Sequence, residues 1–391
     1  MLPTLSSDPR LQLVAAADPR AEARERFAAD FSARTYPTVE ELCDDDNVEA
    51  VYVATPHQHH AAHVQMAASR GKHVLVEKPM AITLRECQAM VEAARRAKIQ
   101  LIVGHSHSFN APILRAREII AGGLVGKARM ISALNYTDYM YRPRRPEELD
   151  TAQGGGVLFS QAAHQIDIVR LLGGGRVRSV RATTGSWDAA RPTEGAYAAF
   201  LTFEDGAFAS AVYSGYAHFD SDEFSGWIGE MGLAKDRDRY GAARKALQNA
   251  ATPAEEAALK NARSYGGRDY APPANPDPAS RLHQHFGLVL VSCERADLRP
   301  LPNGVVIYED FVARLDAVPI PNVPRTEVID ELYEAVIGSR PPLHSGEWAL
   351  ATTEVCLAML RSAREQKEIK LKHQVGIPDT AHAHPQARLS K

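Results

Sequence analysis

A lysine and a carboxylate stand directly after a short apolar strand, in the tripeptide Glu77-Lys78-Pro79. The preceding run, His73-Val74-Leu75-Val76, has the apolar character of a strand in a buried parallel sheet, and such sheets place their chemistry at the carboxyl ends of their strands. Pro79 biases the backbone of Lys78 toward an extended conformation, so the amine can be aimed at a ligand. Thr83 and Glu86 have the spacing of a capping box, which predicts the start of the next helix. A bare Glu-Lys-Pro is more often an ordinary polar turn. Its position at a strand end favours the chemical interpretation, with Lys78 as a catalytic residue.

A second strand leaves the predicted sheet in the same way. Residues 50–54 are apolar and are followed by Thr55-Pro56, and then by a helix that contains His60 and ends before Gly71. The combined run from Val53 to Pro79, with its residues at fixed offsets, resembles the Gfo/Idh/MocA family of oxidoreductases. The resemblance implies a nicotinamide dinucleotide held by Thr55, Pro56, His60, Glu77 and Lys78.

The first hundred residues alternate between apolar strands and helices, which predicts a Rossmann-like parallel sheet. Asp18 follows the strand over 11–17, where a dinucleotide fold places an acid that accepts hydrogen bonds from the adenosine ribose. Such an acid repels a 2′-phosphate, so NAD is expected in preference to NADP. Arg20, also assigned to cofactor binding, weakens that preference. An Asp-Pro pair also starts ordinary turns, and for Asp18 alone the two interpretations are evenly balanced.

The glycine-rich loop of a dinucleotide fold lies roughly 20 residues before its acid. Counting back from Asp18 passes Met1, so this loop and the first strand are missing from the numbered sequence, and residues 2–8 are interpreted as the tail of the first helix. The missing strand is the central one of the sheet. We expect a start assigned too late and weak cofactor binding by the chain as numbered, which the affinity of an upstream-extended chain would test.

Composition excludes several classes of protein. The chain has 45 lysines and arginines and 48 aspartates and glutamates, so it has no excess of basic residues that would indicate nucleic acid binding. No apolar run approaches the length of a membrane span, and no signal peptide opens the chain. The cysteines are scattered without a paired motif, as in proteins of a reducing compartment. The prediction is a cytoplasmic enzyme of small molecules, without nucleic acid or membrane partners.

The second part of the chain has a different pattern. Residues 1–104 form the predicted dinucleotide domain, and residues 105–370 form an α+β domain with a mostly antiparallel open sheet. Its strands are expected over 128–136, 178–186, 196–203, 207–214 and 305–308. A segment over 231–285 interrupts this domain as a lid, an oligomer contact or a passive insertion, with a helical stretch expected over 240–262 and a proline-rich loop over 271–276. Residues 326–338 and 347–366 have the pattern of amphipathic helices. The polar residues 371–391 are expected to form a disordered tail.

One helix of this second domain carries a histidine that the resemblance makes catalytic. The helix follows the triple glycine at 154–156, runs from Phe159 to Leu172 and contains His164. Family members have an aspartate four residues before this histidine, and the two side chains project from one helical face onto the same substrate hydroxyl. Here Ser160 takes the place of the aspartate. A serine cannot stabilise an imidazolium as a carboxylate does, so His164 is expected to act mainly as a neutral base.

Two further segments indicate one subgroup of the family. His107 follows the strand over 100–103, and Arg142, Arg144 and Arg145 lie in a loop stiffened by two prolines. Guanidinium groups bind carboxylates through paired hydrogen bonds, so this loop is interpreted as a carboxylate binder, with a solvated basic loop as an equal alternative. These segments resemble the dihydrodiol dehydrogenases that convert phthalate 4,5-cis-dihydrodiol to 4,5-dihydroxyphthalate in aromatic degradation. The implied substrate is a cyclic diol carboxylate that contacts His107, the three arginines, Ser160 and His164.

The resemblance also implies a mechanism, in which Lys78 takes the proton of a substrate hydroxyl while hydride passes to the nicotinamide and His164 acts as the partner acid or base. Other classes stay open at this point. The histidines at 57, 59, 60 and 63 suggest a metal hydrolase, but no acidic residue has metal-motif spacing with them, and no metal site is predicted. An inositol or sugar dehydrogenase, or a non-catalytic cofactor-binding sensor, would keep the same fold. A homodimer or homotetramer is expected from the family.

Overall fold

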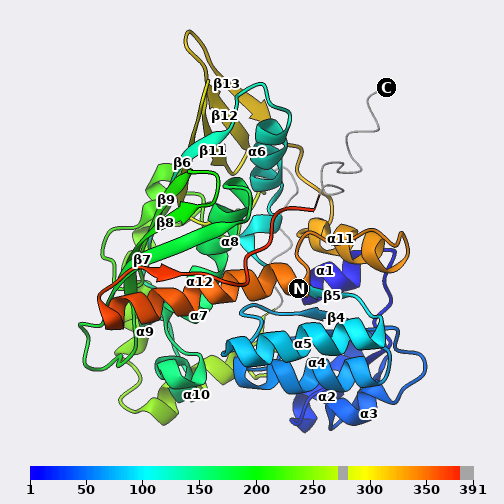
Figure 1. Ribbon diagram of the computed structural model, residues 1–391. Helices are drawn as coiled ribbons and strands as arrows, with labels where there is room; N and C mark the ends of the chain where they lie inside the picture. Colours follow the sequence, from blue (N-terminus) through cyan, green and yellow to red (C-terminus); the bar gives the residue numbers. More distant parts are fainter. Residues whose placement is uncertain (272–280, 379–391) are drawn as a thin grey trace.

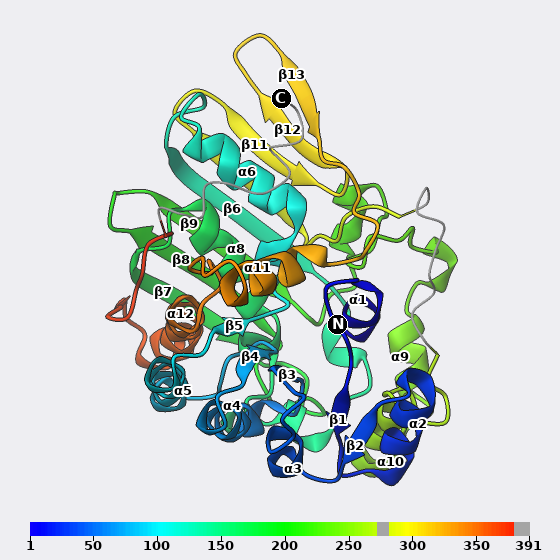
Figure 2. The same ribbon diagram turned by 90° about the vertical axis from the view of Figure 1, so that its right-hand side faces the viewer.

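The computed structural model describes residues 1–271 and 281–378 of the chain. It shows two units side by side, a smaller one built from the first hundred residues and a larger one built around one wide sheet (Figure 1). The C-terminal helices return to the junction between the two units, and Figure 2 shows this junction after a quarter turn. The fold is α/β, as the sequence predicts.

The first unit is a layered arrangement of parallel strands and helices. Its strands pair in parallel in two separate ladders, β1 (Ala15–Ala17) with β2 (Arg34–Tyr36), and β3 (Ala50–Val53) with β4 (His73–Val76) and β5 (Leu101–Val103). The helices are α1 (Leu2–Ser7), α2 (Ala21–Phe31), α3 (Val39–Cys43), α4 (His60–Ser69) and α5 (Leu84–Ala97). The predicted Rossmann-like strands are confirmed, and the helical tail expected over 2–8 is α1.

Side-chain caps set where the helices of this unit begin. Thr83 accepts a hydrogen bond from the Glu86 amide at 3.2 Å, and the Glu86 carboxylate accepts one from the Thr83 amide at 3.0 Å. This reciprocal pair forms the capping box that the sequence predicts for α5. Thr38 caps α3 through the Glu41 amide alone. The loop that contains Lys78 is therefore bounded by a buried strand on one side and a fixed helix start on the other.

The second unit contains a nine-stranded sheet with the order β13-β12-β11-β10-β6-β9-β8-β7-β14. Neighbouring strands run antiparallel, except that β6 and β9 pair in parallel. In chain order the strands are β6 (Ala128–Tyr136), β7 (Val177–Gly185), β8 (Ala196–Phe203), β9 (Phe208–Ser214), β10 (Leu288–Cys293), β11 (Asp297–Leu301), β12 (Gly304–Tyr308), β13 (Ala313–Ala317) and β14 (Ile369–Lys370). The mostly antiparallel open sheet is confirmed, although the sequence patterns do not predict β10, β11, β13 or β14.

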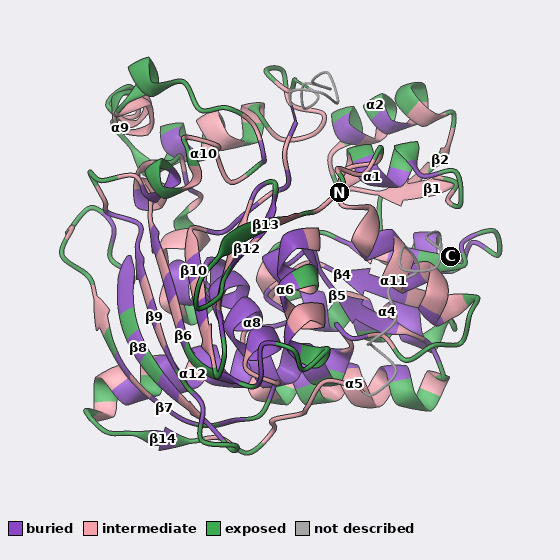
Figure 3. Ribbon diagram, turned by 90° about the horizontal axis from the view of Figure 1, so that it is seen from above, coloured by how far each residue is buried: buried purple, intermediate pink, exposed green. Residues whose placement is uncertain are grey.

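Helices cover one face of this sheet, and burial alternates along its strands (Figure 3). α6 (Ala111–Ala121), α8 (Ala162–Leu172) and α12 (Gly346–Glu365) pack on the covered face, where Ile131, Leu201 and Ala209 are fully buried. Side chains of the opposite parity, such as Phe200 and Phe208, are exposed. The amphipathic helices expected near the C-terminus are α11 (Thr326–Val336) and α12.

The insertion over 231–285 ties the two units together. Its helices α9 (Ala242–Leu247) and α10 (Pro253–Ala262) replace the single helical stretch expected over 240–262. The Tyr265 hydroxyl donates to Asp30 at 2.9 Å, and its ring lies 6.3 Å from that of Phe27, so the insertion packs on α2 (Figure 2). The insertion therefore contacts the first unit, and its role as a lid, an oligomer contact or a passive insertion stays a prediction. Apart from Ala271, the predicted proline-rich loop lies outside the described residues.

The C-terminal segment also departs from expectation. Leu371, Val375 and Ile377 pack against the core of the second unit, and Gln374 donates a hydrogen bond of 2.9 Å to the Ala351 carbonyl. Apolar burial therefore holds the chain through residue 378, and the predicted disordered tail does not begin at residue 371. The remainder, 379–391, lies outside the described residues.

A buried polar network joins the elements at the junction. The Asp167 carboxylate on α8 accepts hydrogen bonds from Ser108 and, at 2.6 Å, from the Trp348 indole. Ser108 is also bonded to His344 at 2.8 Å, and His344 contacts the Glu331 carboxylate at 2.8 Å. Buried polar groups need such partners, because an unpaired one loses its hydration without compensation. The network fixes α8 against α11 and α12.

Candidate active site

Lys78 reaches from the first unit to a break between two helices of the second. α7 (Val157–Ser160) and α8 are separated at Gln161, where the His164 amide donates to the Gln161 carbonyl at 3.1 Å. The Ser160 carbonyl is thus left free by the helix, since helical carbonyls are normally used four residues later. It accepts a hydrogen bond of 2.9 Å from the Lys78 amine. The helix break therefore supplies a main-chain anchor for the predicted catalytic lysine.

This break corrects the expectation of one continuous helix over 159–172 with Ser160 and His164 on a single face. Ser160 closes α7, and its hydroxyl donates to the Gly156 carbonyl at 2.5 Å. It meets Lys78 through its main chain, and its side chain makes no hydrogen bond to His164 among the described residues. The glycine-rich approach at 154–156 explains the short α7, because Gly154 and Gly156 have φ values of 83° and 81°.

Glu77 is held in place by a residue of the neighbouring strand. The Tyr52 hydroxyl on β3 donates a hydrogen bond to the Glu77 carboxylate. Burial, together with the charge of Glu77, raises the pKa of Tyr52 well above its ordinary value, so Tyr52 stays a donor. These contacts support an anchoring role for Glu77 in the loop that carries Lys78.

His60 joins the ends of β3 and β4 beneath the loop surface. It is fully buried, with Nδ1 2.9 Å from the Pro79 carbonyl and Nε2 2.8 Å from the Thr55 carbonyl. Burial lowers the pKa of His60 although both carbonyls favour its charged form. Pro56, by contrast, is exposed at the same edge, and the Thr55 hydroxyl lies 3.0 Å from Nδ1 of His63. Thr55 and Pro56 can therefore meet a ligand, whereas His60 shapes the loops that do.

Asp18 follows β1 at the same edge of the first unit, as predicted. Its two oxygens accept hydrogen bonds from Arg20, at 3.0 Å from Nε and 2.9 Å from Nη2, and its side chain is about one third exposed. A carboxylate has further lone pairs on each oxygen, so Asp18 keeps acceptor capacity for ribose hydroxyls. Arg20 also donates to the Tyr265 carbonyl of the insertion at 3.2 Å. The exposed acid and the open strand ends fit a dinucleotide, and they do not decide between NAD and NADP.

Three histidines converge beside Lys78. His107, in a short 3-10 turn over His107–Phe109, lies with its ring 4.7 Å from that of His164 and 5.2 Å from that of His105. Nδ1 of His107 accepts a hydrogen bond of 2.9 Å from Asn110, so the proton of the neutral ring sits on Nε2, 3.1 Å from Glu230. The predicted pair of His107 and His164 is brought together in the structure.

Glu230 and Arg325 belong to the same cluster and were not predicted. Partial burial works against ionisation of Glu230, but His107, Arg142 and Lys78 outweigh it and lower its pKa to about 2. Arg325 precedes α11 and donates to Gln284 at 3.0 Å, and burial lowers its pKa. Within the described residues, no carboxylate lies within salt-bridge distance of this guanidinium. Both residues reach the site only through tertiary packing, so no sequence motif marks them.

The arginine loop is used differently from the prediction. The Arg144 side chain is buried over the Tyr139 ring at 3.6 Å and donates to the Tyr139 carbonyl at 2.8 Å, while its amide donates to Glu256. Arg145 donates to Asn261 at 2.9 Å. These two arginines attach α10 to the loop. Of the three predicted carboxylate binders this leaves Arg142, whose side chain is 46% exposed and pairs with Asp138 at 3.3 Å.

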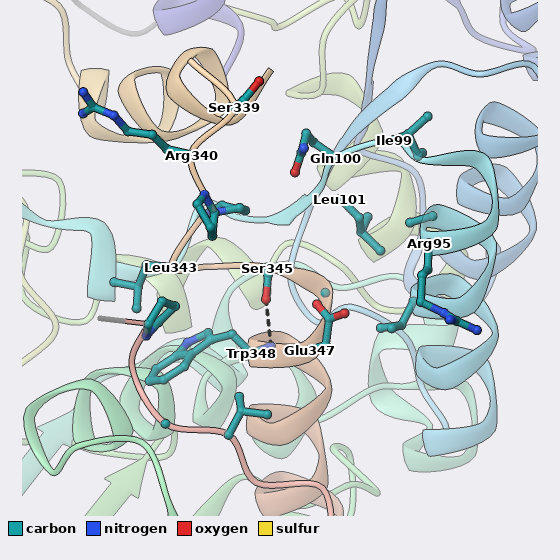
Figure 4. A pocket seen from close by; sticks show the side chains of 18 residues that line it. Arg95, Ile99, Gln100, Leu101, Ser339, Arg340, Leu343, Ser345, Glu347 and Trp348 are labelled. Atoms are coloured by element: carbon teal, nitrogen blue, oxygen red, sulfur yellow. Dashed lines mark hydrogen bonds between the residues drawn. The ribbon is translucent and has the colours of Figure 1, made fainter. Parts of the chain in front are cut away.

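A separate surface pocket of about 510 Å³ lies between α5, the start of β5 and the start of α12 (Figure 4). Arg95, Gln100, Arg340 and Glu347 contribute to its lining, together with Ser345, which caps α12. Neither Lys78 nor His164 takes part, so the chemistry is not placed there. Among residues 1–271 and 281–378, no cluster of histidine, cysteine and acidic side chains is arranged to hold a metal ion. Nor does this part of the chain contain a helix with the length and apolar character needed to span a bilayer.

A parallel α/β unit, a lysine at a strand end and a histidine from an adjoining open-sheet unit define a dinucleotide-dependent dehydrogenase. Residues 1–105 match the model of the oxidoreductase family with an NAD-binding Rossmann fold, and residues 113–232 match the GFO/IDH/MocA C-terminal domain. The chain belongs to the Gfo/Idh/MocA family of oxidoreductases.

Individual relatives place the chain within this family. It is 48% identical over 367 residues to 1-carboxy-3-chloro-3,4-dihydroxycyclohexa-1,5-diene dehydrogenase of Comamonas testosteroni, covering 94% of this chain and 92% of that enzyme. A candidate dehydrogenase from Bordetella bronchiseptica RB50 has a similar crystal structure, with a TM-score of 0.88, 43% identity and coverage of 95% and 96%. The WlbA dehydrogenase of Bordetella pertussis, solved with NADH and UDP-GlcNAcA, shares the fold at 21% identity, with a TM-score of 0.62 and coverage of 93% and 91%.

Proposed function

We propose that the protein is an NAD-dependent dehydrogenase that oxidises a cyclic cis-dihydrodiol bearing a ring carboxylate, in the degradation of aromatic compounds. Phthalate 4,5-cis-dihydrodiol, which would yield 4,5-dihydroxyphthalate, is the substrate we favour within this class. The relative from Comamonas testosteroni, whose name describes a carboxylated cyclohexadiene diol, supports the class. An inositol or sugar dehydrogenase is the alternative.

The observation that carries the proposal is the placing of two guanidinium groups around one histidine cluster. The Arg325 guanidinium donates to Gln284 at 3.0 Å, and the Gln284 main-chain carbonyl accepts from Asn110, which also donates to His107. Arg142 pairs with Asp138 at 3.3 Å, and its charge lowers the pKa of Glu230, which lies 3.1 Å from His107. A guanidinium beside polar ring-binding groups is suited to a carboxylate on the same ring. A neutral polyol would gain nothing from these charges.

The residues of the site divide the chemistry among them. A bound nicotinamide supplies the hydride acceptor, which no side chain can replace. Lys78, anchored on the Ser160 carbonyl, is positioned to take the proton of the substrate hydroxyl. Glu230 and His107 are placed to hold the second hydroxyl of the diol, and Thr55, Pro56 and Asp18 form the edge on which the dinucleotide lies. The ketone formed from a cyclic diene diol tautomerises to a catechol, which draws the oxidation forward.

A direct assay tests this assignment. With NAD, we expect carboxylated cyclic cis-dihydrodiols to be oxidised with a kcat/KM about 10–100-fold above that of myo-inositol, because one charged hydrogen bond is worth about 1.5–3 kcal/mol. The measurement is the rise in nicotinamide absorbance, with NADP assayed in parallel. Faster turnover of myo-inositol would establish the alternative, and no turnover of any diol would favour a non-catalytic sensor. A preference for NADP would overturn the role given to Asp18.

We also propose that the chain forms a homodimer or homotetramer through the uncovered face of its sheet. Met130, Phe200 and Phe208 are 38%, 47% and 38% exposed on neighbouring strands, and the two phenylalanine rings stack at 5.7 Å. Contiguous apolar surface of this kind favours association. Sedimentation equilibrium should give a multiple of the chain mass for the native protein and a smaller mass for Phe200→Glu. Phe311→Glu, on the exposed tip after β12, should leave the native mass unchanged, and a monomeric native protein would contradict the proposal.

A further inference from the structure

We propose that His164 takes part in the reaction as a neutral hydrogen-bond donor through its Nε2–H, and that it does not act as the base. The inference rests on the proposed function, because it assigns a role within the same site. It departs from the sequence-based expectation that His164 is a neutral base. The argument depends on which ring nitrogen can carry the single proton of a neutral imidazole.

The Nδ1 atom of His164 is buried and has no hydrogen-bond partner among the described residues, and the whole residue is only 5% exposed. A proton on Nδ1 would create a buried N–H without an acceptor, a state that folded proteins nearly always avoid. With the proton on Nε2, Nδ1 keeps only an unshared lone pair. The packing therefore selects the tautomer that carries its proton on Nε2.

The polar groups that neighbour His164 in the sequence make hydrogen bonds with other residues. Ser160 uses its hydroxyl on the Gly156 carbonyl, and its own carbonyl is taken by Lys78. The side-chain oxygen of Gln161 accepts from Tyr213 at 3.3 Å, and that of Gln165 accepts from Tyr197 at 2.8 Å. The ring centroid of Phe286 lies 5.2 Å from that of His164 and adds apolar surface beside it.

The groups around His164 also keep it uncharged. Lys78 faces it from the end of β4, His105 and His107 from the segment after β5, and Arg325 from the start of α11. Neither nearby carboxylate pairs with His164. Glu230 is hydrogen-bonded to His107, and Asp167 on α8 accepts hydrogen bonds from Ser108, Trp348 and Thr352. Burial first, and then these neighbours, hold the pKa of His164 well below its ordinary value. An imidazolium is therefore not formed at neutral pH.

The chemistry is balanced with Lys78 as the only base. Lys78 has to enter this step as the neutral amine: the hydroxyl proton passes to its Nζ, which becomes the ammonium, the oxygen becomes a carbonyl, and the bound nicotinamide would supply the acceptor for the hydride that leaves the carbinol carbon. The Nε2–H of His164 donates a hydrogen bond to that oxygen while the charge on the oxygen changes. His164 itself loses no proton in this step. Removing one preorganised donor of this kind lowers kcat by about 10²–10³ in enzymes where it has been measured.

Nuclear magnetic resonance of the native protein tests the tautomer without reference to catalysis. In ¹⁵N-histidine-labelled protein, long-range proton–nitrogen spectra distinguish a protonated from an unprotonated ring nitrogen. The His164 signals are those lost in both His164→Gln and His164→Asn. We expect a neutral ring with a protonated Nε2 throughout pH 6–9. A proton on Nδ1, or an imidazolium within this range, would overturn the inference even if the enzyme oxidises the expected diol.

Kinetics of the same variants test the donor role. The amide nitrogen of glutamine can replace Nε2–H, whereas the shorter asparagine mimics Nδ1, so His164→Gln should retain a kcat about tenfold above that of His164→Asn. The acidic limb of the kcat/KM profile should be the same in His164→Gln as in the native enzyme. A limb that is lost in His164→Gln would show that His164 is the base. His283→Gln, a buried histidine bonded to the Val318 carbonyl away from the site, controls for general destabilisation.

Discussion

Replacing Lys78 with alanine is expected to lower kcat by about 10²–10⁴, the range measured for a positioned acid or base, with a much smaller effect on dinucleotide affinity. The amine spans the junction of the two units and lies on the Ser160 carbonyl at 2.9 Å, beside His164. No other lysine is placed at this edge by the described contacts. Its loss removes the proton acceptor and leaves the sheet intact. The measurement is steady-state turnover of a cis-diol, with dinucleotide binding followed by fluorescence.

Two comparisons make this result specific. Lys78→Met keeps the length of the side chain without the amine and should match the alanine variant in kcat. Lys127→Ala, at an exposed position before β6, should behave as the native enzyme. Because Lys78→Ala also leaves the Ser160 carbonyl without its donor, thermal unfolding should be recorded for each variant. Native turnover by Lys78→Met would remove the lysine from the mechanism.

Arg325→Met is expected to raise the KM for a carboxylated cyclic diol by about 10–100-fold, the value of one charged hydrogen bond, and to change kcat less. The guanidinium is held by Gln284, whose carbonyl accepts a hydrogen bond of 2.9 Å from Asn110, the residue that orients His107. This chain of contacts places the charge beside the histidine cluster of the candidate site. A diol without a carboxylate should show nearly the same KM in the variant and in the native enzyme.

Arg281→Met is the matched control for this result. Arg281 is also buried and donates to main-chain carbonyls, including that of Pro321, but it is not among the charges that act on His164. The KM values of Arg281→Met for the carboxylated and the uncarboxylated diol should equal those of the native enzyme. If Arg325→Met weakens the dinucleotide and the carboxylated diol equally, the anion that Arg325 binds is a cofactor phosphate. Unchanged KM for both ligands would exclude Arg325 from binding.

The parts of the site that lie on regular elements are predictable from the sequence. The apolar run of β4, the capping pair Thr83 and Glu86, and the strand end at Asp18 are local features, and each is found where periodicity and caps place it. Lys78 is located because it follows such an element directly. His107 and His164, 57 residues apart in the chain, required the family resemblance to be paired.

The remaining features depend on tertiary contacts that have no local signal. Arg144 and Arg145 match a carboxylate binder by composition, but their partners come from α10, more than a hundred residues later. Arg325 shows no motif because its role comes from a left-handed backbone at φ 58° before α11 and from packing beside Gln284. The break at Gln161 is equally hidden, since residues 159–172 have a continuous helical pattern and, among the described residues, the freed Ser160 carbonyl is used by Lys78.

The buried network of Asp167, Ser108, His344 and Glu331 limits how this enzyme can evolve. Exchanging any one member leaves the others buried and unsatisfied, at a cost of about 1–3 kcal/mol for each unpaired group, which is a large share of the stability of a typical domain. Replacing all members by apolar groups of similar shape can be nearly neutral. Substitutions at these positions are therefore expected to occur together, in several members of the network. Since Ser108 and Asp167 lie within three residues of His107 and His164, these two histidines of the candidate site inherit the same constraint.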